Sequence, residues 1–167
     1  MEIHQAILEV ERKFRSVFAR LPVIVGNEAV NFTLDNFRMQ GFMGNTFQRW
    51  LPRKQSWGNK KFGGKNILIG VGRLRRSIRI THVSANMVAI GSDVKYARAH
   101  NEGLRLGVIQ TVKGFTRRNG TTVSGHQRRI DMRIPQRRFM GPSPYLNARL
   151  KRVALAEFMK ENKFIRP

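Results

Sequence analysis

Apolar residues recur every three or four positions through the first twenty residues of the chain, with charged residues between them. The positions that keep this spacing are Ile3, Ile7, Val10, Phe14 and Val17. Such a period places apolar side chains on one face of an amphipathic helix, here over residues 1–20. The pair Leu21-Pro22 predicts the end of this helix, because a proline in a helix interior removes a backbone hydrogen bond. A second helix is then expected to begin with Pro22 in its first turn and to reach about Gln40.

The apolar pattern is lost over residues 41–66. This stretch is rich in Gly, Asn, Lys and aromatic residues and keeps neither a helical nor a strand period. It therefore predicts a long, flexible connecting loop, most mobile around Asn59–Lys65. Trp50 and Trp57 are candidates for side chains that hold this loop against the core.

Short apolar runs separated by turn residues follow, as in small antiparallel sheets. The stretch "VGRLRRSIRI" predicts a short helix over Gly72–Ser77 and then a strand to about Val83. "SAN" supplies a turn, and "MVAIG" supplies the second arm of a hairpin. "KYARAHNEG" predicts a short helix that ends at Gly103, because glycine adopts a left-handed cap at the lowest cost.

The last third of the chain predicts a long hairpin and a closing helix. Two β-type runs within residues 104–134 flank Asn119-Gly120, a dipeptide typical of hairpin tips, so we expect a long basic ribbon. A final helix is predicted from Pro144 to about Lys160, with Ser143 as its N-terminal cap. Its buried stripe is predicted to consist of Leu146, Leu150, Val153, Ala154 and Phe158.

These elements predict an α+β fold: N-terminal helices, a small antiparallel sheet with a long basic β-ribbon, and a C-terminal helix. A chain of 167 residues fits a single domain, 1–167, with one hydrophobic core. Within it we expect a helical part (1–40), a flexible loop (41–66) and an α+β core (67–160) that carries the ribbon (104–134). No stretch is apolar enough for a membrane span, and the N-terminus does not resemble a secretory signal.

Charge is the extreme feature of the composition. The chain contains 32 Lys and Arg against 10 Asp and Glu, which gives a net charge of +22. Such a field attracts polyanions, so nucleic acid, an acidic protein or an anionic membrane surface would each satisfy it. Half of the Asp and Glu lie in the first 35 residues, which makes this acidic N-terminal part a candidate to meet the basic remainder of a neighbouring copy. Cysteine is absent, which excludes disulfides and thiolate metal sites.

Residues that would support catalysis are few and scattered. The four histidines lack metal-ligand spacing, and we interpret His100 as a surface residue near a helix end. The carboxylates of the central chain are Asp93, Glu102 and Asp131, whereas a magnesium-dependent nuclease needs a cluster of acids. Asp93 is expected to order the "GSD" turn, and Glu102 to pair with a nearby arginine. We therefore expect no enzymatic activity, no metal and no cofactor.

Basic side chains are concentrated in the predicted ribbon and just after it. The candidates for contact with DNA or a protein partner are Lys113, Arg117, Arg118, Arg128, Arg129 and Arg133. On a β-ribbon this density predicts several arginines on each face, where they can bind phosphate or carboxylate. The alternative is a solvated hairpin, whose charges keep it soluble and block edge-to-edge pairing.

Three segments, "ILIGVGRLRRSIRI", "MVAIGSDVKYARAHNEG" and "IPQRRFMGPSP", together resemble the phage virion morphogenesis family. That family includes Mu-like and lambda-like tail-completion proteins of the head–tail neck. The matching motif positions are Gly72, Leu74, Ser77, Ile78, Ile90, Gly91, Tyr96, Ala97, Gly103, Ile134, Pro135, Arg137 and Phe139. The resemblance covers residues 30–160 and implies that Leu74, Tyr96 and Phe139 are core or corner residues. Val71 stands where the family usually has a threonine, which removes a side-chain cap at the corner.

The resemblance implies a non-enzymatic structural protein of the virion, assembled in the host cytoplasm. Such proteins form a ring at the neck or at the head-proximal end of the tail, around the channel that DNA traverses, and six or twelve copies are expected. The implied partners are further copies of the chain, adjoining neck, connector or tail-tube proteins, and DNA in the channel, with no membrane. The basic segment 110–133 varies in such proteins, so the resemblance assigns it no role.

Two other functions stay open at this point. A free nucleic-acid-binding protein would use the same positive charges, and a metal-dependent nuclease would use one of the three central acids. The arginines of "VGRLRRSIRI" are interpreted as residues that the helix-to-strand corner displays to solvent or to a neighbouring subunit. They are Arg73, Arg75, Arg76 and Arg79. Any contact with DNA is instead assigned to the ribbon around "RRNG".

Overall fold

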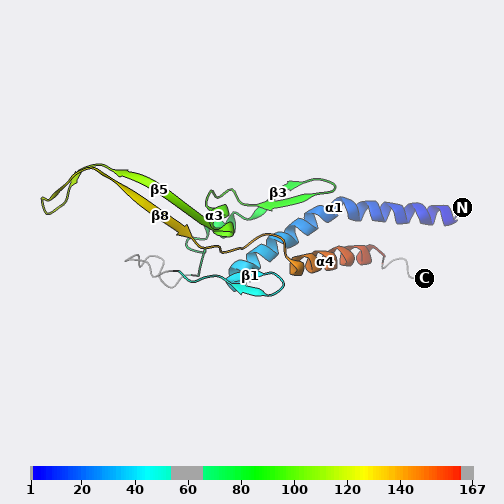
Figure 1. The fold of residues 1–167 in the computed structure, drawn as a ribbon. Coiled ribbons are helices and arrows are strands. Elements are labelled where there is room, and N and C mark those ends of the chain that lie inside the picture. The colour runs from blue at the N-terminus through cyan, green and yellow to red at the C-terminus, as the bar shows by residue number, and fades with distance from the viewer. Residues whose placement is uncertain (1, 54–65, 163–167) are drawn as a thin grey trace.

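The computed structural model describes residues 2–53 and 66–162, which form an α+β fold with the predicted order of helices, antiparallel strands and a closing helix. Its elements are α1 (Glu2–Met39), β1 (Gly41–Met43), β2 (Phe47–Arg49), α2 (Arg73–Arg76), β3 (Arg79–Val83), β4 (Val88–Gly91), α3 (Ala97–Glu102), β5 (Leu104–Val112), β6 (Phe115–Thr116), β7 (Thr122–Val123), β8 (His126–Ile134) and α4 (Pro144–Asn162). The strands pair as four separate two-stranded antiparallel sheets, β1–β2, β3–β4, β5–β8 and β6–β7. The molecule is elongated, with α1 and α4 side by side at one end and the β5–β8 hairpin projecting from the other (Figure 1).

The N-terminal part is one helix, so the predicted break at Leu21-Pro22 is wrong. Pro22 lies inside α1, where it cannot donate to the carbonyl of Phe18. An internal proline costs about 3 kcal/mol in an isolated helix. Here α1 continues because α4 and the β3–β4 hairpin both pack against it, and Val17 of this helix is completely buried. The helix changes direction along its length (Figure 1), as helices with an internal proline do.

The β3–β4 hairpin lies across α1 at Gly26. A methyl group in place of the Gly26 hydrogen would lie 2.7 Å from the side chains of both Ile80 and Val88. A larger residue would therefore push the hairpin away from the helix. Val88 pairs with Val83 at the far end of the hairpin, and the register shifts between Ile80 and His82. The predicted strand–turn–strand arrangement is confirmed.

Helix α4 packs along α1 with the predicted cap. The Ser143 hydroxyl accepts a hydrogen bond from the N–H of Leu146 at 3.2 Å and donates one to the carbonyl of Met43 at 2.6 Å. The ring of Phe158 contacts those of Phe14 and Phe18, with centroids 5.7 and 5.3 Å apart. The rest of the predicted stripe is half-buried against α1.

An ion cluster also joins the two long helices. Arg149 of α4 donates to Glu28 at 2.5 Å and to Asp35 at 3.0 Å, and Arg20 of α1 contacts Glu157 and Glu161. Two of the five acids in the first 35 residues are therefore used inside the chain to bind α4. These contacts fix α4 to the second half of α1.

Residues 41–49 form a hairpin, so the predicted irregular loop over 41–66 is wrong in this part. Gly41 pairs with Arg49, and Met43 pairs with Phe47. Trp50 follows directly, is 5% exposed, and donates its indole N–H to the carbonyl of Arg138 at 2.6 Å. The prediction that Trp50 holds this segment to the core is confirmed. Trp57 and Asn59–Lys65 lie outside the described residues.

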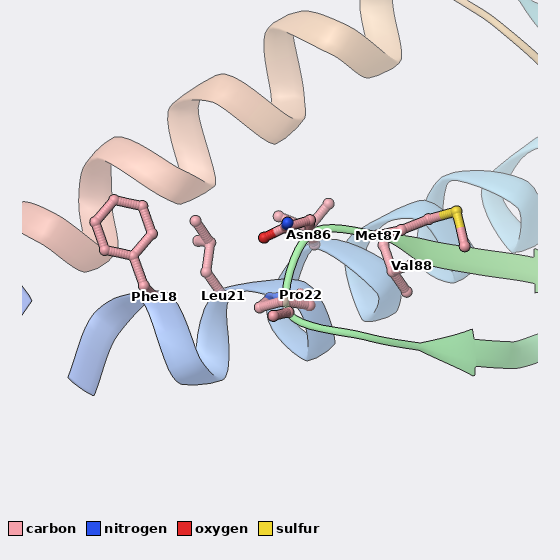
Figure 2. Close-up of a pocket in the computed structure, with 8 residues that line it drawn as sticks. Phe18, Leu21, Pro22, Asn86, Met87 and Val88 are labelled. Atoms are coloured by element: carbon pink, nitrogen blue, oxygen red, sulfur yellow. The ribbon is translucent and has the colours of Figure 1, made fainter. Parts of the chain in front are cut away.

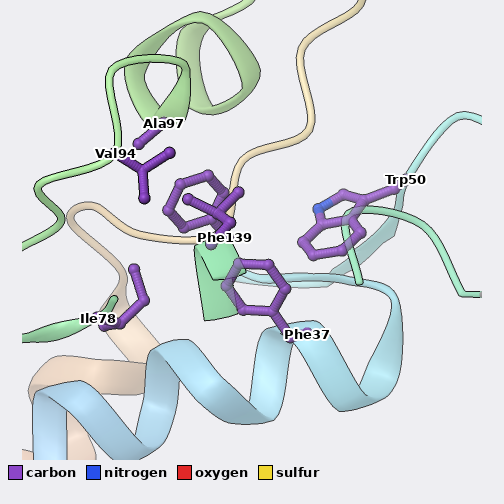
Figure 3. Packing of buried hydrophobic residues seen from close by; sticks show 7 residues of the cluster. Phe37, Trp50, Ile78, Val94, Ala97 and Phe139 are labelled. Atoms are coloured by element: carbon purple, nitrogen blue, oxygen red, sulfur yellow. The ribbon is translucent and has the colours of Figure 1, made fainter. Parts of the chain in front are cut away.

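The hydrophobic core is a small cluster beside the end of α1 (Figure 3). Its buried members are Phe37, Trp50, Leu74, Ile78, Val94, Ala97 and Phe139. The rings of Phe37 and Phe139 are 5.1 Å apart, and Trp50 meets Phe37 edge-on at 5.5 Å. Every segment that resembles the family contributes a side chain to this cluster. Four of the motif positions, Leu74, Ile78, Ala97 and Phe139, therefore lie together in the core.

The corner between α2 and β3 forms as predicted. Gly72 precedes α2 with φ 81° and ψ 3°, a left-handed conformation that suits glycine, and no side chain caps the helix there. Leu74 and Ile78 point into the core, and the four arginines of this stretch are exposed. Gly103 ends α3 with φ 80° but ψ 160°, so the predicted left-handed cap is wrong: the chain turns directly into β5.

We expect the Phe139→Ala variant to lose about 3–5 kcal/mol of unfolding free energy, because Phe139 is fully buried at the centre of the cluster. Urea denaturation followed by tryptophan fluorescence measures this loss, since Trp50 reports on the same core. The control is Phe115→Ala, which removes the same ring from a site that is 49% exposed and should cost under about 1 kcal/mol. Equal losses in the two variants would contradict the assignment of the core.

Candidate functional site

The β5–β8 ribbon is exposed along most of its length, and its register divides its side chains between two faces. Leu104 pairs with Ile134 at the base, and Val112 pairs with His126 toward the tip. Directly paired residues of an antiparallel ladder project from the same face, and that face recurs at every second residue. Nine residue pairs therefore divide into two sets. The faces of this ribbon have different chemistry.

The first face carries most of the charge, and we call it the arginine face. It consists of Arg105, Gly107, Ile109, Thr111, Gln127, Arg129, Asp131 and Arg133. Arg105 lies directly opposite Arg133, and the guanidinium of Arg105 reaches Asp131 at 3.8 Å. Both partners of that ion pair are largely exposed, so it contributes little stability. The three arginines of the arginine face can therefore turn to an incoming phosphate or carboxylate with little loss of folding stability.

The second face is apolar along most of its length, and we call it the apolar face. Its apolar members are Leu104, Leu106, Val108, Val112, Ile130, Met132 and Ile134. Leu106, Val108 and Met132 are 45%, 41% and 47% exposed, although residues of this kind are usually buried. No described element of the chain makes extensive contact with this face.

The sequence predicted several arginines on each face of the ribbon, and within β5 and β8 this is wrong. Arg128 is the one arginine of these two strands on the apolar face, where it donates to Gln110 at 2.8 Å. Arg105, Arg129 and Arg133 share the other face. The sequence of β5 does indicate this division, because apolar residues alternate strictly at positions 104, 106 and 108. The prediction missed it because it counted charges and did not consider the alternation.

The tip of the ribbon holds the remaining basic candidates. The N–H of Gly120 donates to the carbonyl of Arg117 at 2.9 Å, and Gly120 has φ 82°, as the predicted turn at Asn119-Gly120 requires. Lys113, Arg117 and Arg118 are exposed around it. They extend the positive charge of the ribbon to its outer end.

A second group of motif residues holds the segment 135–140 in place. Arg137 is only 8% exposed, and its guanidinium donates to the carbonyls of Leu51 and Pro52 at 3.0 and 3.3 Å. Its backbone N–H donates to the carbonyl of His100 at 2.7 Å. Burial lowers the pKa of Arg137, and the charge of Arg53 lowers it further. The hydrogen bonds of Arg137 therefore connect α3 with the segment after Trp50.

Three further motif residues have environments that the sequence did not resolve. Ser77 donates its hydroxyl to the carbonyl of Leu74 at 2.7 Å and also bonds the hydroxyl of Ser92 at 2.6 Å. Tyr96 is 45% exposed and is therefore not a core residue; it packs edge-on against the ring of His100. Pro135 is half-buried where β8 leaves the ribbon.

His100 is half-buried rather than a surface residue, which corrects the sequence interpretation. Its Nδ1 atom is buried without a hydrogen-bond partner in the structure. Burial lowers the pKa of His100 below its ordinary value of 6.5, and the guanidinium of Arg137 lowers it further. His100 is therefore neutral near pH 7, and protonating it opposes folding.

The acids that an enzyme would need are dispersed. Asp93 is exposed beside Arg79 at 3.6 Å, and it is Ser92 that accepts the N–H of Val94 and orders the "GSD" turn. Glu102 accepts a hydrogen bond from Arg98 at 2.8 Å, as predicted for a pairing with a nearby arginine. Within residues 2–53 and 66–162, no group of three or more His, Asp or Glu lies close enough to hold a metal ion.

A shallow pocket of about 200 Å³ lies between α1 and the tip of the β3–β4 hairpin (Figure 2). It is lined by Phe18, Leu21, Pro22, Val25, Ala85, Asn86, Met87 and Val88. No titratable side chain lines it, so it offers apolar contact and no acid, base or nucleophile. None of the helices in the described residues has the length and hydropathy that a bilayer span requires.

The described residues thus form an α+β protein in which an exposed ribbon with two different faces projects from a small core. The model of the phage virion morphogenesis family matches residues 3–158, nearly the whole chain. The chain therefore belongs to this family of structural phage virion (tail) proteins, which is not known as an enzymatic family. Neither a curated protein nor a solved structure shows significant similarity to it.

We expect the unfolding free energy to fall as the pH drops below about 6.5, because of His100. The unfolded chain binds a proton there at its ordinary pKa, whereas the folded chain, with a lowered pKa, binds it less readily. The contribution of neutral His100 to the unfolding free energy is thus complete at pH values above the pKa of the unfolded chain. It is lost as the pH falls toward the lower pKa of the folded chain. Urea denaturation at several pH values should give a shallower dependence in His100→Gln. The exposed-site control His126→Gln should keep the wild-type slope, and an unchanged slope in His100→Gln would refute the assignment.

Proposed function

We propose that this chain is a structural protein of the head–tail neck or tail-completion region, where it assembles as a ring around the DNA channel. The observation that carries the proposal is the arginine face of a ribbon that projects from the folded body. Nine residues at about 3.4 Å each give β5 and β8 a reach of about 30 Å. A ribbon of that length can enter a channel while the helices stay in the ring wall.

Family membership supports this proposal at the level of the virion. A structural protein of the virion has other virion proteins as its neighbours, and those near the channel also meet DNA. The arginines of the ribbon suit DNA, because Arg105, Arg129 and Arg133 present guanidinium groups in one direction along a narrow strip. The proposed partners are copies of the chain, adjoining neck, connector or tail-tube proteins, and DNA. Six or twelve copies would fit a ring of this kind.

The charge distribution limits how the copies meet. Residues 1–35 contain five Asp and Glu and four Lys and Arg, so they are close to neutral, and the rest of the chain holds the positive excess. Glu9 and Glu11 pair with Lys13 and Arg15 on the same helix. Residues 1–35 therefore lack the excess of negative charge that would attract the basic part of a neighbouring copy. We propose that contact between copies uses apolar surface and that DNA or acidic neighbours offset the positive charge.

The proposal is tested by electron microscopy of particles assembled without this protein. We expect heads and tails that fail to join, or tails without a finished head-proximal end, and a loss of infectious particles. Supplying the chain in trans should restore joined particles. Normal infectious virions in its absence would contradict the proposal.

The second candidate is a free nucleic-acid-binding protein, which the net charge of +22 favours. It predicts tight DNA binding by the isolated monomer, with log affinity falling steeply as log salt rises. A neck protein should bind weakly until it is assembled. Replacing Arg105, Arg129 and Arg133 by Ala should reduce the salt slope by about 0.9 for each phosphate that the variant no longer neutralises. The matched control replaces three exposed arginines of α2 by Ala, which removes the same charge. It should reduce the salt slope less than the replacement of Arg105, Arg129 and Arg133 does.

A further inference from the structure

We propose that the apolar face of the β5–β8 ribbon binds the exposed apolar stripe at the start of α1 in a second copy of this chain. The inference rests on the proposed function in one respect only, which is that copies of the chain assemble. It goes further by naming the two surfaces that meet.

The ribbon supplies the first surface. Leu106, Val108 and Met132 are each more than 40% exposed, and they lie beside one another because the register pairs Leu106 with Met132 and Val108 with Ile130. A contiguous apolar patch on a soluble protein marks an interaction site or an aggregation hazard. A two-stranded ribbon with one bare apolar face is also marginal in water without a covering layer. This face therefore needs a partner with an apolar surface.

The start of α1 supplies the second surface. Ile3, Ile7 and Phe14 belong to the predicted helical stripe, and their exposed fractions are 80%, 60% and 40%. The same stripe ends at Val17, which is completely buried. Phe14 contacts Phe158 near the end of α4, so among the described residues α4 covers less of α1 toward its N-terminus. The outer turns of α1 keep the pattern of a packed helix without a described neighbour.

The two surfaces cannot cover each other within one chain, because the ribbon and the start of α1 lie at opposite ends of the elongated molecule (Figure 1). Their dimensions match. The stripe from Ile3 to Phe14 is about 16 Å long at 1.5 Å per residue. The apolar stretch from Leu104 to Val108 is about 14 Å long at 3.4 Å per residue. A helix can therefore lie along the base of the ribbon and cover it.

Charge decides which copy-to-copy contact is favoured. Residues 104–134 contain seven Lys and Arg and one Asp, so two ribbons placed face to face would repel each other. The near-neutral start of α1 avoids this repulsion. A contact between two different surfaces also repeats from copy to copy, and it closes into a ring when the rotation permits. The arginine face stays outside this contact and remains available to a polyanion.

The test uses the absence of cysteine from the natural chain, so that introduced thiols are the only ones present. One preparation carries Ile7→Cys and another Val108→Cys, and the two are mixed and oxidised. We expect a covalent dimer of one Ile7→Cys chain with one Val108→Cys chain on a non-reducing gel, its composition established by mass spectrometry. The double variant should give a ladder of linked copies.

The matched control is Ile109→Cys, one residue along β5 and on the arginine face, with Ile109 69% exposed. It should give at least tenfold less product with Ile7→Cys. A dimer of two Val108→Cys chains in place of the mixed dimer would show that ribbons pair with each other and would overturn the proposal. Absence of the mixed dimer in conditions where the wild-type chain is oligomeric would also overturn it.

A second measurement separates this contact from a folding defect. Leu106→Thr with Val108→Thr keeps residues that favour strands but makes the apolar face polar. Sedimentation velocity should show at least a tenfold weaker self-association than for Ile109→Thr, with unchanged circular dichroism of the monomer. If the protein is not located at the neck, the crosslink between copies would still be expected. If the crosslink does not form, the proposed location at the neck is not affected.

Discussion

The buried contact between Phe139 and the end of α1 is the interaction on which the rest of the fold depends. The backbone carbonyl of Phe139 accepts a hydrogen bond from the amide of Asn36, and its N–H donates to the side chain of Asn101. Both Phe139 and Asn36 are completely buried. Because an unpaired buried polar group is costly, these bonds fix one arrangement of α1, α3 and the segment after β8. The ribbon base, the α2 corner and the entry to α4 are positioned as a consequence.

A small core leaves much apolar surface outside it. Exposed apolar side chains occur in many parts of the chain, and they form runs on the apolar face of the ribbon and at the start of α1. A monomer with this distribution is incomplete, since two of its extended elements have no described layer against their apolar sides. Membership of a structural virion family is consistent with our proposal that a second copy of the chain supplies one of these layers. We propose that the arginine face meets a different partner from the apolar face.

Local sequence signals predicted the elements that local chemistry determines. The turn at Asn119-Gly120, the Ser143 cap and the corner at Gly72 each depend on a few neighbouring residues, and each was confirmed. Elements that depend on distant contacts were missed. Pro22 is accommodated because α4 and the β3–β4 hairpin pack on α1, and the hairpin at residues 41–49 is fixed beside Met43 by Ser143, a hundred residues away. The motif residues were recognised as a set, but Tyr96 is more exposed and His100 less exposed than expected, because their packing is tertiary.

The candidate site was predicted by charge and corrected by register. Counting arginines located the ribbon, whereas only the strand pairing shows that Arg105, Arg129 and Arg133 lie on one face and the leucines on the other. We propose that these faces meet different partners in the virion. A cryo-electron microscopy reconstruction of the intact particle tests it most directly. We expect the arginine face to be turned toward the DNA channel and the apolar face to be covered by protein. An arginine face packed against protein, with the apolar face open to the channel, would contradict it.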